Sequence, residues 1–279
     1  MKTTGEKIRQ PAVAGTFYSG TKDALRKELE AIFSSLTERS VNRKIHGIIV
    51  PHAGYLYSGT TAAHAYRLLQ GTTYDAVIIA GPSHREFFDK ISIYPGDAFS
   101  TPLGTVPIQQ ELREELLHFS TEFIDSAIGH RTEHSIEVQI PFLQTVLRNT
   151  PIVPIVIGNQ SAFLCTLLGK AFAQIGKGRN LLFVASSDLS HYHPYEEAVA
   201  LDKHVLDSVE TFDPDLWMSK FEAEELEACG GGPIAAVMSA SKQLGATKAE
   251  ILHYCNSGDT SGDISGVVGY LAAAFIQEK

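Results

Sequence analysis

Four short runs of apolar, largely β-branched residues constrain the fold of this chain more than any other feature. They cover residues 46–50, 76–81, 151–158 and 181–186. Such runs, without a polar residue at every second position, are typical of strands that are buried on both faces, as in a parallel sheet. Stretches with the apolar spacing of helices separate them, which is the alternation expected of an α/β protein. We therefore predict a central mixed, largely parallel sheet flanked by helices.

Helical spacing is clearest in residues 22–36, where Leu25, Leu29, Ile32 and Phe33 fall on one face. The same spacing predicts further helices over residues 61–70, 109–119, 133–148, 165–176, 195–212 and 233–244.

Proline and glycine mark where these helices and other segments change direction. Pro141 should kink or bound the helix predicted over residues 133–148, because proline disrupts a helix interior. Glycines and prolines within residues 90–108 favour a hairpin or meander there. Residues 250–258 are expected to form a strand, and the apolar run 266–277 fits either a strand or a helix.

Composition bounds the class of protein. The chain has 279 residues, of which 44% are hydrophobic and 20% charged, as in an ordinary globular protein with enough apolar material for a core. Because no Pro/Ser-rich linker, charge block or low-complexity tract interrupts it, we predict one domain over residues 1–279.

Charge and hydropathy exclude several partners. A formal net charge of -9 repels phosphate backbones, so no nucleic acid partner is expected. Residues 1–10 lack the apolar core of a signal peptide, and no stretch approaches the ~20 apolar residues of a membrane helix. We therefore expect a cytoplasmic protein without a membrane partner.

The three cysteines do not form a disulfide framework in this prediction, because they are odd in number and widely spaced. Cys165 lies in an apolar helical stretch and is interpreted as a buried packing residue.

Histidines follow the ends of three predicted strands. His52 comes after the run 46–50, His84 after 76–81, and His191 after 181–186. Ligands in open α/β sheets gather beyond the carboxyl ends of the strands, so these side chains should reach one crevice. Each histidine alone could instead cap a turn. Together, His52 and His84 can meet across neighbouring strand ends, which is how a divalent metal takes ligands distant in sequence.

Cys229 precedes three glycines and Pro233, which is a plausible first residue of the following helix. The positive end of that helix should lower the pKa of the thiol and favour the thiolate. A thiolate binds metals and also attacks carbonyls, so three interpretations stay open: a metal ligand, a nucleophile with His191 as its base, and a structural thiol.

His191 and Asp188 form a candidate acid/base pair. Asp188, three residues earlier, can orient an imidazole or act as an outer carboxylate near a metal. The alternative is a polar loop in which Ser186, Ser187 and Asp188 cap the following helix.

A second tier of candidates lines the predicted crevice or binds a ligand. His134, with Glu133 and Glu137 nearby, either lines the cleft or belongs to a solvated helix face. Tyr57, with Tyr55, is a candidate for substrate binding. Other histidines are treated as surface or packing residues: His46, His64, His118, His193, His204 and His253.

Several collinear motifs give the chain a recognisable pattern. They are PAVAGTFY, PHAGYLYSG, GPSH, TPLG, EHSIEVQIPFL, SSDLSHY and CGGGPI. In these motifs the chain resembles the Memo family, whose prokaryotic members are called AmmeMemoRadiSam system protein B. The resemblance covers essentially the whole chain and implies a single Memo-like domain, similar in fold to class III extradiol dioxygenases.

The resemblance also implies a site. His52 in PHAGY and His84 in GPSH match two histidine ligands of one metal ion, Cys229 in ACGGGP matches the third ligand, and His191 in SSDLSH matches an acid/base histidine. Extradiol dioxygenases have a carboxylate where this chain has Cys229. A soft thiolate favours copper(I) or a more covalent iron(II) site, so ring opening of catechols does not follow from the resemblance.

The function implied is that of a metal-dependent, dioxygenase-like oxidoreductase acting on a small-molecule or peptide ligand, with AMMECR-type and radical SAM proteins as partners. Two alternatives belong to other classes. One is a non-enzymatic adaptor that binds peptides or handles metal in the same cleft. The other is a cysteine hydrolase, which needs Cys229 and His191 within hydrogen-bond reach.

Overall fold

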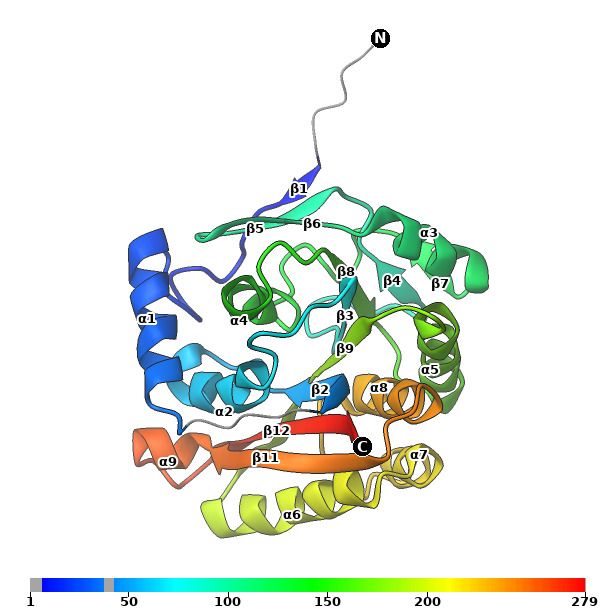
Figure 1. The fold of residues 1–279 in the computed structure, drawn as a ribbon. Helices are drawn as coiled ribbons and strands as arrows, with labels where there is room; N and C mark the ends of the chain where they lie inside the picture. Colours follow the sequence, from blue (N-terminus) through cyan, green and yellow to red (C-terminus); the bar gives the residue numbers. More distant parts are fainter. Residues whose placement is uncertain (1–6, 38–42, 279) are drawn as a thin grey trace.

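A large mixed sheet forms the centre of the molecule (Figure 1). The structure is a computed structural model that describes residues 7–37 and 43–278. Residues 1–6, part of the N-terminal stretch in which we found no signal peptide, lie outside the described residues. Within the described ranges the sheet has nine strands. Four inner strands run parallel, in the order β2 (Lys44–Val50), β9 (Leu181–Ser186), β3 (Ala76–Pro82) and β8 (Ile152–Ile157).

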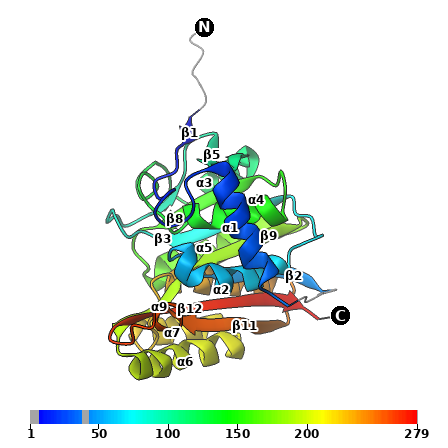
Figure 2. The same cartoon turned by 90° about the vertical axis from the view of Figure 1, so that its left-hand side faces the viewer.

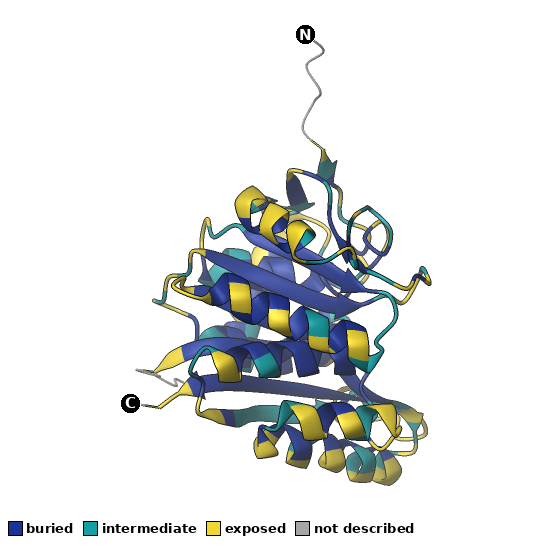
Figure 3. Cartoon of the chain, turned by 90° about the vertical axis from the view of Figure 1, so that its right-hand side faces the viewer, coloured by how far each residue is buried: buried dark blue, intermediate teal, exposed yellow. Residues whose placement is uncertain are grey.

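These four strands are the four apolar runs, and both of their faces are buried. Along β3, Val77 and Ile79 pack into one core, whereas Ile78 and Ala80 pack into the other. Burying each such aliphatic side chain stabilises the folded state by roughly 1.5–3 kcal/mol. Figure 3 shows the inner strands buried and the exposed residues confined mainly to the outer helix faces. The predicted α/β class is confirmed.

The outer strands extend this sheet on both sides. The run 266–277, left open between strand and helix, is the strand β12 (Val267–Gln277), antiparallel to β2. It also pairs with β11 (Lys248–Asn256) and β10 (Asp188–His193). At the other side lie β4 (Ile91–Ile93) and β7 (Phe123–Asp125). A separate small sheet contains β1 (Ile8–Arg9) and the expected hairpin of β5 (Ala98–Thr101) and β6 (Gly104–Pro107).

Helices cover both faces of the sheet (Figures 1 and 2). On one face lie α1 (Lys22–Ser34), α2 (Tyr55–Arg67) and α4 (Ile140–Val146), preceded by the 3-10 helix η1 (Glu137–Gln139). On the other face lie α3 (Gln110–Phe119), α5 (Ala162–Gly176) and α8 (Gly231–Gln243). Helices α6 (Tyr195–Thr211) and α7 (Pro214–Glu222) lie beyond β11 and β12, and α9 (Ser257–Ser261) links these two strands. None of the helices in the described ranges is both long and apolar enough to cross a bilayer.

Four helix starts differ from the prediction by two or more residues. The helix expected from residue 133 begins only with η1 at Glu137, and α5 begins at Ala162 and not at residue 165. Helix α2 begins at Tyr55 and not at the expected residue 61. A Cβ at Gly59 would stand 3.0 Å from Ile32 Cδ1, so this glycine lets α2 pack closely against α1. Helix α8 begins at Gly231, so Pro233 is its third residue and not its first. Pro141 lies in the first turn of α4 and bounds that helix, as expected.

Candidate metal centre

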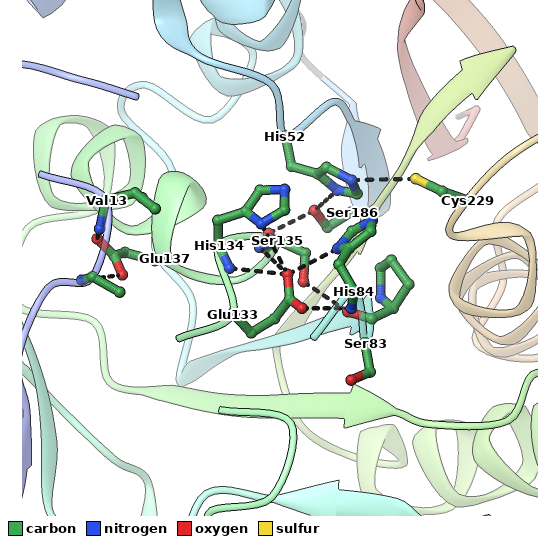
Figure 4. Close-up of polar contacts among 12 residues, drawn as sticks. Val13, His52, Ser83, His84, Glu133, His134, Ser135, Glu137, Ser186 and Cys229 are labelled. Carbon is green, nitrogen blue, oxygen red and sulfur yellow. Dashed lines mark hydrogen bonds and ion pairs between the residues drawn. The ribbon is translucent and has the colours of Figure 1, made fainter. Parts of the chain in front are cut away.

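The predicted ligands meet at the ends of three adjacent strands. His52 follows β2, His84 follows β3, and Cys229 approaches the end of β9, which lies between those two strands. One potential ligand atom from each of the three side chains lies within 4.8 Å of the other two. Figure 4 shows His52 and His84 facing one another with the sulfur of Cys229 directed at His52. The cluster has the soft and imidazole donors that iron, copper and zinc accept.

Hydrogen bonds fix which nitrogen of His52 is free. Ser186 Oγ donates its one proton to the Ser135 carbonyl at 2.7 Å, and accepts from Gln139 Nε2 at 3.0 Å. His52 Nδ1, 2.9 Å from the same oxygen, must therefore be a donor. This leaves the lone pair of His52 Nε2 facing Cys229 Sγ at 3.2 Å. Buried and oriented in this way, His52 is prepared to ligate a metal through Nε2.

Glu133 sets the orientation of His84 in the same manner. Its carboxylate accepts a hydrogen bond from His84 Nδ1 at 2.9 Å, so Nε2 again carries the free lone pair. It also accepts the backbone N–H groups of His84, His134 and Ser135. Burial alone would raise the pKa of Glu133, but these hydrogen bonds hold it well below its usual range. Glu133 therefore stays an anion that holds His84.

Cys229 is held against the end of β9 by two backbone contacts. Its sulfur accepts the Asp188 N–H at 3.2 Å, and its own N–H donates to the Asp188 carbonyl at 3.2 Å. This approach needs Gly230, because a Cβ there would stand 2.3 Å from the Ser186 carbonyl oxygen. The predicted thiolate is wrong for the metal-free protein: burial, followed by the Asp188 carboxylate, raises the pKa of Cys229 despite the nearby helix end. A bound cation would reverse this balance.

Asp188 faces His52 rather than His191. Its Oδ1 accepts the backbone N–H of His52 at 2.7 Å, and its Oδ2 lies 3.8 Å from His52 Nε2. Burial raises the pKa of Asp188 to about 7, although hydrogen bonds from His52 and Ala53 oppose the shift. The alternative in which residues 186–188 cap a helix is wrong, because β10 starts at Asp188 and Pro194 precedes α6. Asp188 is thus a buried carboxyl group with a raised pKa that lies beside the candidate ligand His52.

His191 lines a cavity of about 630 Å³ that also reaches Cys229. Its backbone N–H donates to Glu227 Oε1 at 3.1 Å, and burial lowers its pKa. Three carboxylate residues and three apolar side chains complete most of the lining: Glu222, Glu224, Glu227, Leu189, Phe221 and Leu226. Another hollow of about 660 Å³, between α1, β6 and α4, contains none of the predicted site residues.

His134 lies beside the cluster rather than on a solvated helix face. Its ring centroid is 4.7 Å from that of His84 and 5.4 Å from that of His52. Burial lowers the pKa of His134 to about 4, so it is neutral at pH 7. Tyr57 lies on α2 and is 39% exposed. Substrate contact by either residue stays a prediction.

The arrangement does not pair Cys229 with His191, the base that the hydrolase interpretation requires. Within residues 7–37 and 43–278, the Cys229 sulfur has hydrogen-bond contacts with His52, Ser187 and Asp188, and none with His191. The base required by the hydrolase interpretation is therefore out of place.

Sequence reasoning missed the residues that hold the candidate ligands. Ser186 was considered only as a cap and Glu133 only as a neighbour of His134, whereas Gln139 was not considered at all. His193 was treated as a surface or packing residue, yet its Nε2 lies 2.9 Å from Glu227 Oε2 at the cavity. The nearest signal was the spacing of Glu133, His134 and Glu137 around a predicted helix start.

Comparison with known proteins agrees with this fold and motif pattern. A crystal structure of the uncharacterized protein JW3007 from Escherichia coli K12 has a similar fold, with a TM-score of 0.58 and 14% sequence identity over 82% of this chain and 99% of that chain. A MEMO1 family protein of Methanosarcina barkeri is 41% identical over 269 residues, which are 95% of this chain and 98% of that relative.

A MEMO1 family protein of Nitrosopumilus maritimus is 39% identical over 274 residues, which are 96% of this chain and 100% of that relative. A family model described as Memo-like protein matches residues 9–274. Because both kinds of match extend over nearly all of the sequence, this chain belongs to the Memo family.

Proposed function

We propose that this protein binds one transition-metal ion, iron(II) or copper(I), through His52, His84 and Cys229, and acts as a metal-dependent oxidoreductase. The observation that carries the proposal is the fixed orientation of the two imidazoles. Ser186 and Glu133 occupy the Nδ1 atoms, which leaves Nε2 of each imidazole free, and both histidines belong to the same cluster as the thiol. Two nitrogens and one sulfur are a donor set that fits these ions.

The surrounding residues would manage protons and access to the cluster. When bound, the ion would supply Lewis-acid and redox chemistry at this position. Asp188, with a pKa raised to about 7 by burial, can give or accept a proton next to His52. His191 lines the cavity through which a ligand would reach Cys229, and it can exchange protons there.

The first test is anaerobic titration of the metal-free protein with iron(II) and with copper(I), followed by elemental analysis. We expect one ion per chain and a melting temperature that rises with metal concentration, because an ion that binds only the folded state stabilises it. Binding of neither ion, or an unchanged melting temperature throughout, would remove the proposal.

Oxygen consumption separates an enzyme from an adaptor. If the iron-loaded protein consumes no oxygen with any catechol or reductant, the peptide-binding or metal-handling role is favoured.

Partnership with AMMECR-type and radical SAM proteins remains part of the proposal, and co-purification from cell extract would test it. All three cysteines are free, which supports a cytoplasmic, reducing location.

The acidic cavity should favour cationic ligands. Glu222, Glu224 and Glu227 line it, and no lysine or arginine among the described residues does. Small thiols that differ only in their terminal charge can test this, since sulfur binds a cobalt(II) ion loaded into the protein. Cysteamine should bind at least about fivefold more tightly than 3-mercaptopropionate, because the terminal groups differ by two unit charges and one charge near the surface contributes about 1 kcal/mol.

Glu224→Gln should reduce this preference for the cationic thiol. Glu122→Gln is the control, because Glu122 lies in the loop before β7 and does not line the cavity, and it should leave the preference unchanged. Equal affinity of the two thiols for the wild-type protein at low salt would contradict the expectation.

A further inference from the structure

The N-terminal segment, residues 8–18, lies against the loop that carries His52 and against the loop that carries Glu133 and His134. The Phe17 carbonyl accepts a hydrogen bond of 2.7 Å from the Tyr55 N–H, three residues after His52. The ring of Phe17 lies 4.9 Å from that of His134, between centroids. The segment therefore supports the centre although it supplies none of the candidate ligands.

Arg9 attaches this segment to the loop that contains Glu133. The Arg9 side chain is 5% exposed, and its three donor nitrogens bind three acceptors in residues 130–137. Nε donates to the His130 carbonyl at 2.7 Å, Nη2 to the Glu133 carbonyl at 2.6 Å, and Nη1 to Glu137 Oε2 at 2.6 Å. A guanidinium holds these donors in a rigid fork, so the three contacts fix the path of the loop.

Glu137 completes the attachment from the other side. Its fully buried carboxylate also accepts the N–H groups of Ala12 and Val13, at 2.8 and 3.0 Å, and the hydroxyl of Tyr18 at 2.7 Å. Figure 4 shows Glu137 against Val13, on the same loop as Glu133 and His134. Both charges of the Arg9 and Glu137 pair are thus hydrogen-bonded, as buried ions require.

We propose that Arg9 is a positioning residue for His84. By holding the Glu133 carbonyl, Arg9 fixes the backbone of the residue whose carboxylate accepts His84 Nδ1 at 2.9 Å. The position of Glu133 in turn determines which imidazole nitrogen of His84 faces Cys229. The expected effect of Arg9 on metal affinity rests on the proposed function. Its expected effect on the His84 tautomer applies to the metal-free protein and does not depend on that function.

The test is Arg9→Lys, which keeps the positive charge beside Glu137 but replaces the fork with one ammonium group. In nitrogen-15 spectra of the metal-free wild type, His84 should be the Nδ1–H tautomer, and in the variant it should be a mixture of tautomers. Cobalt(II) affinity should fall about tenfold, as for loss of an outer hydrogen-bond partner, and the visible spectrum of bound cobalt(II) should change.

Arg113→Lys is the matched control, because Arg113 is also buried and also forms ion pairs and a carbonyl contact, but with Asp125, Glu114 and Tyr94. It should lower stability without changing the His84 tautomer or the cobalt(II) spectrum. A wild-type tautomer in Arg9→Lys overturns the positioning role, and so does an equal loss of affinity in both variants. If the wild type binds no metal, the proposed function fails, and the tautomer comparison still decides the role of Arg9.

Arg9→Met with Glu137→Gln covers the case in which the single variant does not fold. Removing both members of a buried ion pair avoids leaving one charge buried and unpaired, which is strongly destabilising. The double variant also lacks the fork on the loop carbonyls. It should therefore show the same mixture of His84 tautomers, and a pure Nδ1–H tautomer there would contradict the proposal.

Discussion

Cys229→Ala is expected to weaken iron(II) binding by more than about 100-fold and to leave the metal-free fold intact. The variant removes one of three ligands, so the loss should exceed the 10–100-fold cost of losing an outer hydrogen-bond partner. In the metal-free protein the thiol contributes a hydrogen bond to His52 Nε2 at 3.2 Å and accepts the Asp188 N–H at 3.2 Å. Losing both should lower the free energy of unfolding by about 1–3 kcal/mol, which a folded variant tolerates.

Titration followed by elemental analysis measures the first quantity, and urea unfolding of the metal-free proteins measures the second. Cys255→Ala is the matched control, since Cys255 is also a half-buried free cysteine. Its sulfur is hydrogen-bonded to Thr61 Oγ1 at 3.0 Å and not to the candidate centre. Unchanged iron content in Cys229→Ala would eliminate the proposed coordination.

His130 should make the stability of the fold strongly dependent on pH. It is 1% exposed, its Nε2 lies 3.1 Å from the Ser92 carbonyl, and its Nδ1 has no hydrogen-bond partner among the described residues. Burial lowers its pKa to about 3, against 6.5 for an ordinary histidine. Between these values the unfolded chain binds a proton that the folded protein does not, so stability falls as the pH falls below 6.5.

The slope approaches about 1.4 kcal/mol per pH unit well below pH 6.5, and the expected loss between pH 6.5 and pH 4.5 is about 2 kcal/mol. His130→Gln, whose amide can still donate to Ser92, should lose that much less stability than the wild type over the same range. Urea unfolding of the metal-free proteins at several pH values measures the difference. The exposed His118→Gln should follow the wild type. Parallel curves for His130→Gln and the wild type would show that His130 is not the cause.

The sequence predicts those parts of the fold in which the pattern of apolar residues along the chain matches the burial of those residues in the structure. Strands β2, β3, β8 and β9 are apolar at nearly every position because helices cover both of their faces, and this gives an unambiguous signal. Strand β10 gives no such signal: Asp188–His193 is polar and bulged, with register shifts against β12. The sheet order, with β9 between β2 and β3, also cannot be predicted from any local sequence pattern.

The candidate site divides in the same way. His52, His84 and Cys229 follow or approach strand ends, so their meeting could be expected from general rules of α/β sheets. The residues that orient them could not be found, since Ser186 is 134 positions from His52 and Glu133 is 49 positions from His84. Hydrogen bonds over such separations depend on the order of strands in the sheet and on the path of the loops. Neither can be predicted from the local spacing of apolar residues.

The insertion of β9 between β2 and β3 has a consequence for biosynthesis. The two imidazoles leave the ribosome early, but the strand that separates and supports them follows about 100 residues later, and the sulfur later still. A nascent chain that ends before the C-terminal third can therefore present the histidines without Cys229 and without the cavity that reaches it. Metallation is expected only after translation is nearly complete, so the ion should be acquired by an already folded polypeptide.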